Sequence, residues 1–234
     1  MKRLSPFVML VLVCAAVPAP AGADKPADTK AALQLLQDYI GGWKGNGQSD
    51  KEAGSIWKES ADWSWRFKGK DAYFSVDLAN SKLFKKGELR YLPAKEAYQL
   101  TLTDVNDKQK VFEGELKRSY LVLERTDPDT EEGEQVKINT AGEGLRLIVA
   151  YSVRRPERTQ FTRQMLVSYT KEGESFGSSA GKRPECVVTG GLGTMAVSFN
   201  GMTYYVCCSG CRDAFNENPA KVIAEYLARK KAGR

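Results

Sequence analysis

The six residues Asp62-Trp63-Ser64-Trp65-Arg66-Phe67 alternate strictly between apolar and polar side chains. Successive side chains of a β-strand point to opposite faces, so the aromatic residues of this stretch share one face. Similar alternation recurs with turn residues between the runs, at residues 43–48, 56–59, 74–78, 83–92, 98–103, 110–115, 119–125, 134–140, 145–154 and 160–170. About ten short strands with one apolar face each predict a closed antiparallel sheet or a sandwich.

The segment before the first strand changes period. Apolar residues of the stretch 29–40 fall at helical spacing, which predicts an amphipathic helix. That helix is expected to end at Gly41-Gly42, and Trp43 follows at once.

A helix, a Gly-x-Trp motif and an up-and-down series of strands resemble the lipocalin and fatty-acid-binding superfamily of calycin barrels. The resemblance implies an antiparallel up-and-down β-barrel with a short leading helix and a mainly β fold. It also implies that Trp43 closes one end, with Arg163 or Arg154 stacked on it, and that the barrel carries a small apolar ligand. The alternative is that the large apolar side chains, including those of Trp63, Trp65, Phe74, Leu100 and Leu147, simply fill the interior.

Four of the five cysteines lie within residues 186–211, at Cys186, Cys207, Cys208 and Cys211. Residues 194–199 and 202–206 alternate around Asn200-Gly201, which is the preferred sequence of a type I′ hairpin turn. A hairpin brings its ends together, so we expect Cys186 to return beside the later cysteines. Converging thiolates can hold a soft metal ion or pair as disulfides.

This cysteine spacing resembles the YHS/TRASH family of small treble-clef-like metal-binding modules. The matching features are Cys186, the aromatic pair Tyr204-Tyr205, Cys207 with Cys211 four positions later, and the downstream Phe215. The resemblance covers residues 182–226 and implies that Cys186, Cys207 and Cys211 are metal ligands. Many relatives have a further cysteine where this chain has Thr189, so the best candidate for a fourth ligand is Cys208, an additional cysteine.

Two alternatives to a metal site stay open. Exported proteins with an even number of cysteines usually form disulfides, although a bridge between neighbouring residues such as Cys207 and Cys208 would be strained. A bridge from Cys208 to Cys211 would instead resemble the active site of a thiol–disulfide enzyme. If a metal binds, four sulfurs favour Zn²⁺, whereas two or three suit Cu(I) equally well.

The N-terminus has the pattern of a secretory signal peptide. Lys2 and Arg3 precede a short apolar run, and Ala21-Gly22-Ala23 places small residues at the cleavage site. We expect cleavage after Ala23, which would remove Cys14 and leave a periplasmic or secreted protein. The alternative is an uncleaved membrane anchor, although the apolar run is short for one.

The composition excludes several classes of function. The chain contains no histidine, which removes histidine-based triads, His-ligated haem and His₃ metal centres. The formal charge falls from +6 to +4 without Lys2 and Arg3, and acidic and basic residues are interspersed. We therefore expect no nucleic-acid binding. We also expect no stable membrane insertion after cleavage. No enzymatic activity is expected, because the barrel offers no general-base or nucleophile constellation.

Taken together, these features predict a signal peptide over residues 1–23, a β-barrel domain over 24–172, a linker over 173–184 and a cysteine module over 185–234. The module is expected to consist of a hairpin and a helix, and each part is expected to fold separately. Metal handling, sensing or metal-stabilised interaction is the first functional hypothesis, and the lipocalin-like carrier with structural cysteines is the second.

Overall fold

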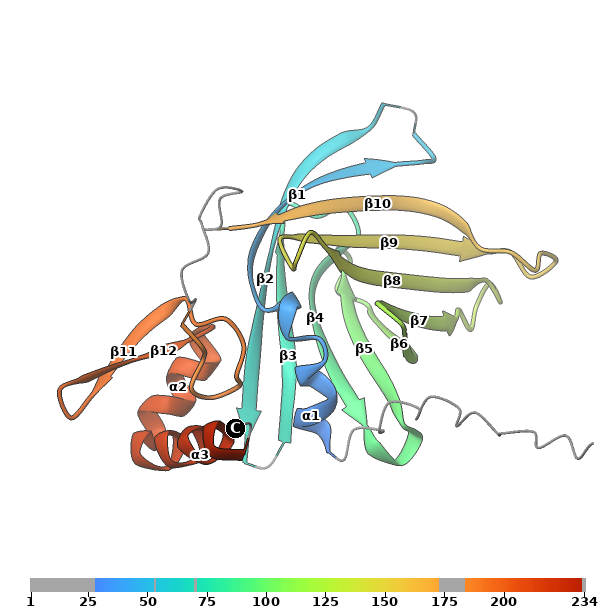
Figure 1. The fold of residues 1–234 in the computed structure, drawn as a ribbon. Helices are drawn as coiled ribbons and strands as arrows, with labels where there is room; N and C mark the ends of the chain where they lie inside the picture. Colours follow the sequence, from blue (N-terminus) through green and yellow to red (C-terminus); the bar gives the residue numbers. More distant parts are fainter. Residues whose placement is uncertain (1–27, 53, 70, 173–183, 233–234) are drawn as a thin grey trace, which may run out of the picture.

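The computed structural model describes residues 28–52, 54–69, 71–172 and 184–232. The expected signal peptide and all but the last residue of the expected linker lie outside these ranges. Within them, ten antiparallel strands form a closed barrel in which strands adjacent in sequence are hydrogen-bonded neighbours and β1 also pairs with β10 (Figure 1). The predicted mainly β, up-and-down barrel is therefore confirmed.

The barrel strands follow one another along the chain with short connections. They are β1 (Gly41–Ser49), β2 (Ile56–Lys68), β3 (Asp71–Ala79), β4 (Phe84–Leu92), β5 (Ala97–Asp104), β6 (Gln109–Lys117), β7 (Tyr120–Thr126), β8 (Gly133–Ala141), β9 (Arg146–Arg154) and β10 (Thr162–Lys171). A 3₁₀ turn, η2 (Pro93–Lys95), connects β4 to β5. The two alternating runs predicted at residues 56–59 and 62–67 belong to the single strand β2.

The leading helix is shorter than the apolar pattern predicts. It consists of α1 (Thr29–Gln34), capped by the Asp28 side chain, and a separate 3₁₀ turn, η1 (Gln37–Tyr39). The backbone leaves the helical region at Leu36, with φ −108° and ψ 19°, before the chain enters β1. The chain must turn there to bring Trp43 into the barrel wall, and this tertiary requirement overrides the helical pattern.

Trp43 is fully buried, as the calycin resemblance implies, but its cationic neighbour is a different residue. Its indole nitrogen donates to the carbonyl of Tyr39 over 2.8 Å, and Lys171 Nζ lies 4.9 Å from the ring centroid. The expectation of Arg163 or Arg154 in this place is wrong. Arg163 pairs with Asp50, whereas Arg154 lies over the ring of Phe161. The strand register accounts for this difference, because Lys171 is directly opposite Trp43 in the β1–β10 pair.

The barrel interior is filled largely by aromatic and branched side chains. Trp65 lies 4.6 Å from Phe74 between ring centroids in an edge-on arrangement, and both side chains are fully buried. One interior pocket among these residues has a volume of about 50 Å³. Pockets for small organic ligands usually have volumes of about 300–1,000 Å³. A barrel could carry a ligand, but this interior would have to rearrange to hold one of that size.

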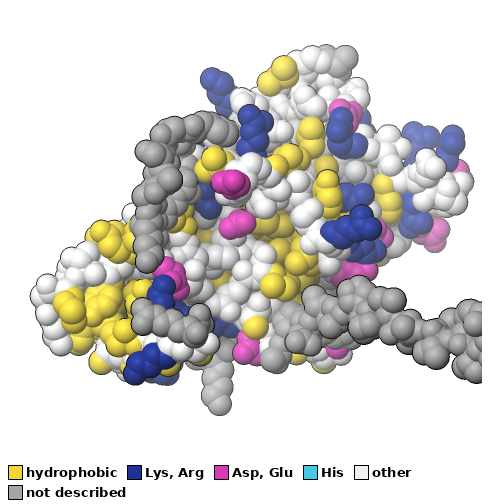
Figure 2. Space-filling model, in the orientation of Figure 1, with side chains coloured by type: hydrophobic (Ala, Val, Ile, Leu, Met, Phe, Trp, Pro, Cys, Tyr) yellow, Lys and Arg dark blue, Asp and Glu magenta, His cyan; other side chains and the backbone are white. Residues whose placement is uncertain are grey.

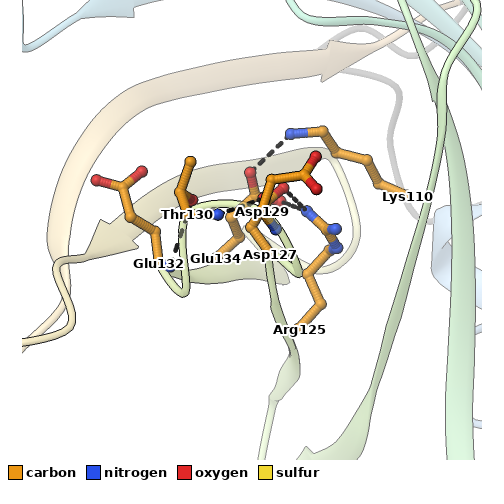
Figure 3. Close-up of polar contacts among 7 residues, drawn as sticks. All are labelled: Lys110, Arg125, Asp127, Asp129, Thr130, Glu132 and Glu134. Atoms are coloured by element: carbon orange, nitrogen blue, oxygen red, sulfur yellow. Dashed lines mark hydrogen bonds and ion pairs between the residues drawn. The ribbon is translucent and has the colours of Figure 1, made fainter.

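A buried carboxylate ties three strands together near one end of β7 and β8. Glu134 on β8 accepts hydrogen bonds from Lys110 on β6, over 2.6 Å, and from Arg125 on β7, over 2.5 Å (Figure 3). Burial raises the pKa of Glu134, but the hydrogen bonds from Lys110 and Arg125 outweigh it and hold that pKa below its usual value.

The C-terminal part lies against the barrel beside one end of β2 (Figure 1). It contains the hairpin β11 (Met195–Phe199) and β12 (Met202–Val206), followed by α2 (Ser209–Glu217) and α3 (Pro219–Ala232). Asn200 and Gly201 both have positive φ, as the predicted type I′ turn requires. Hydrophobic side chains gather over this hairpin on the face shown in Figure 2. Whether the two parts fold separately stays a prediction.

Among the described residues, no helix is both long enough and apolar enough to span a bilayer.

Candidate metal centre

Three backbone elements bring the cysteines together. Cys186 forms a parallel bridge with Tyr205 of β12, and its amide donates to the carbonyl of Gly191 over 2.6 Å. Cys207 and Cys208 directly follow β12, and Cys211 lies in the first turn of α2. The hairpin and the short loop after Cys186 therefore place all four cysteines at one end of β12.

The sulfur atoms of Cys186, Cys207 and Cys211 all lie within 4.8 Å of one another. Cys207 Sγ is 3.4 Å from Cys211 Sγ and 3.9 Å from Cys208 Sγ. All four described cysteines are buried free thiols. A disulfide joins its sulfurs at about 2.05 Å, whereas sulfurs on a tetrahedral Zn²⁺ ion are about 3.7 Å apart. This buried group of three cysteines could hold a metal ion, with Cys208 beside it.

Polar groups of the barrel part contact two of the sulfurs. The side-chain amide of Gln37 donates to Cys207 Sγ over 3.8 Å, and its oxygen accepts from the indole nitrogen of Trp65 over 2.9 Å. The backbone amide of Trp65 donates to Cys208 Sγ over 3.4 Å. Donors that surround metal ligands in this way orient them and tune their basicity.

Thr189 also lies at the cluster. Its hydroxyl is 3.6 Å from Cys207 Sγ, and the residue is buried. The resemblance to the YHS/TRASH family drew attention to this position, where many members of that family have a cysteine. It gave no indication of the contact with Cys207. The contributions of Gln37 and Trp65 had no signal in the sequence, because they come from elements about 170 and 143 residues away.

The pKa values of the four thiols shift in opposite directions within the cluster. Hydrogen bonds from Cys207 and then Cys211 lower the pKa of Cys186 and of Cys208. The pKa of Cys207 and of Cys211 is raised, first by the hydrogen bond each makes with Cys186. Buried thiolates repel one another, so the cluster cannot ionise fully unless a cation compensates the charge. A metal ion is the natural cation for such a set of donors.

Comparisons with known proteins do not identify a family or a function for this chain. No protein-family model matches the chain, and no curated protein matches it. Among solved structures, the chain is similar to the M. tuberculosis protein Rv2717c, with 16% sequence identity and a TM-score of 0.39. The match covers 60% of this chain and 97% of that one. A likeness of this extent carries no argument about function.

Proposed function

We propose that this protein binds a soft or borderline transition metal, Zn²⁺ or Cu(I), through the thiolates of Cys186, Cys207 and Cys211. The observation that carries the proposal is the convergence of three buried, unpaired sulfurs to within 4.8 Å of one another. Thiolates select these ions over hard cations such as Mg²⁺ or Ca²⁺. The absence of histidine means that sulfur supplies the soft donors.

Cys208 is the candidate for the fourth ligand. Its sulfur is 3.9 Å from that of Cys207, but it does not belong to the compact group of three. Three sulfurs suit Cu(I), and recruitment of Cys208 would complete a tetrahedral Zn²⁺ site. Comparison of Cys186→Ser with Cys208→Ser therefore separates an essential ligand from an auxiliary one.

The proposed role is metal handling outside the cytoplasm, without catalysis. The signal-peptide pattern before Asp24 supports export. A buried site assembled from protein ligands beside the barrel suits storage, sensing or delivery of an ion. Intact-mass measurement of exported protein tests the location, since retention of residues 1–23 would contradict it.

The proposal is tested by metal analysis of protein purified under reducing conditions, together with Cys186→Ser. We expect about one metal ion per chain in the wild type and a loss of bound metal in the variant. Cys186 is the appropriate position because it is fully buried and is supplied by a different backbone segment from the other ligands.

A further inference from the structure

A cleft of about 320 Å³ lies between the barrel and the cysteine module. Its walls include Cys207 and Cys208 on the module side, with Asp38 and Asp62 on the barrel side. Cys186 and Cys211 do not line it. The cleft therefore reaches two of the four cysteines, whereas the other two do not line it.

The exposures of the four cysteines agree with this division. Cys186 and Cys211 have no solvent-accessible surface, whereas Cys207 and Cys208 each keep 6% exposure. An ion approaching through the cleft would meet Cys207 and Cys208 before the deeper sulfurs.

The charge along the cleft is unevenly distributed. The charged residues that line it are Asp38, Asp62, Glu172 and Lys171, three acids and one base. Glu172 pairs with Lys44 over 3.2 Å, and Lys171 donates to the backbone carbonyl of Asp38 over 3.1 Å. A concave surface with an excess of one sign of charge concentrates counterions and raises their rate of association.

We propose that this cleft is the route by which metal ions enter and leave the cysteine centre. This inference rests on the proposed function. In this scheme Asp38 and Asp62 attract the hydrated cation, and Cys207 and Cys208 are the first sulfurs to bind it. The ion then passes to Cys186 and Cys211, which hold it from the buried side. Each sulfur that binds replaces a water on the ion, and each thiol releases its proton to solvent.

Cys208 has a specific part in the scheme. Cys208 lines the cleft, and its sulfur is 3.9 Å from that of Cys207, so it can bind an ion before the compact group of three closes around it. On the way out, the same sulfur can stay attached while an incoming donor replaces a buried ligand. Such stepwise exchange avoids releasing a bare ion.

The first test measures the rate of metal entry. Co²⁺ alone, a spectroscopic substitute for Zn²⁺, is mixed with the reduced, metal-free full chain, and the thiolate-to-cobalt absorption is followed in a stopped-flow instrument. The double variant Asp38→Asn/Asp62→Asn should load about threefold to tenfold more slowly than the wild type at low salt. The difference should vanish near 1 M salt, where the Debye length is about 3 Å.

The matched control is Asp213→Asn. Asp213 lies on α2 two residues after Cys211, is exposed and pairs with Arg212, but does not line the cleft. It should load at the wild-type rate. Equal slowing by Asp213→Asn, or unchanged rates in the double variant, would overturn the route while leaving the metal site intact. Failure of the wild type to bind any of Co²⁺, Zn²⁺ and Cu(I) would instead contradict the proposed function.

The second test needs no variant. Limited alkylation of the metal-free wild type with iodoacetamide, a neutral reagent, should modify Cys207 and Cys208 before Cys186 and Cys211, as mapped by mass spectrometry. Earlier modification of Cys186 or Cys211 would show that the sulfurs are reached from another side.

Discussion

The backbone amide of Trp65, the last of three consecutive buried residues in β2, donates a hydrogen bond to Cys208 Sγ over 3.4 Å. The carbonyl oxygen of the same residue lies against Gly210, so closely that a Cβ on Gly210 would be 1.7 Å from it. Both polar groups of one barrel residue thus face the first turn of α2. The cysteine cluster is therefore built on the barrel wall.

This contact predicts the effect of Gly210→Ala. Alanine is favoured over glycine inside a helix by about 1 kcal/mol, so helix propensity alone predicts stabilisation. The clash with the Trp65 carbonyl predicts the opposite, a loss of about 1–3 kcal/mol as α2 moves away from β2. Urea unfolding measures the difference. Ser209→Ala is the control. It removes only a 3.4 Å contact with Arg66 and should lower the free energy of unfolding by less than Gly210→Ala does. A more stable Gly210→Ala protein would contradict the close packing.

The barrel and the convergence of the cysteines could be predicted from the sequence, because both follow from local patterns. Strand alternation such as that around Trp63 and Trp65 depends only on neighbours in the chain. The turn at Asn200-Gly201 likewise has a local signature. The partners of the sulfurs do not, since Gln37 and Trp65 reach the cluster only through tertiary packing. The neighbour of Trp43 was missed for the same reason, because strand register decides it.

The buried carboxylate Glu134 predicts a pH-dependent contribution to stability. Its pKa is lower in the folded protein than in the unfolded chain, so ionised Glu134 stabilises the fold at neutral pH. That contribution is fully present above its unfolded pKa of about 4.3 and disappears as the pH falls through the lower folded value. Glu134→Gln should therefore lower the free energy of unfolding by about 1–3 kcal/mol at pH 7.

The measurement is urea unfolding of wild type and Glu134→Gln across the acid range. The free energies of unfolding of the wild type and Glu134→Gln should converge in acid. The control, Glu157→Gln on the exposed β9–β10 connection, should have the stability of the wild type at every pH. A difference that stays constant with pH would mean that ionisation of Glu134 contributes nothing.

The filled barrel predicts that apolar ligands do not bind with high affinity. An environment-sensitive apolar dye should give a flat titration, since about 50 Å³ of free volume is too small for it. Trp63 lines that pocket and provides an internal reporter through its emission. Saturable binding with a change in tryptophan emission would support the lipocalin-like carrier instead.

The serine variants of the cysteines should divide into two groups. Cys186→Ser removes a buried member of the compact group and should reduce Zn²⁺ affinity by at least tenfold. Cys208→Ser should bind more weakly than the wild type but more tightly than Cys186→Ser. Competition with a chromophoric chelator measures both, and circular dichroism verifies that the barrel is retained. Equal losses would mean that Cys208 is as essential a ligand as Cys186.

The central claim is that Cys186, Cys207 and Cys211, with Cys208 as the candidate fourth ligand, form a thiolate centre for a metal. Its most direct test is the metal content of purified mature protein, measured with a count of free thiols after unfolding in the presence of a chelator. The account predicts about one Zn or Cu per chain and four free thiols, from Cys186, Cys207, Cys208 and Cys211. Protein that contains no metal and no free thiol would contradict it, because the cysteines would then be paired as disulfides.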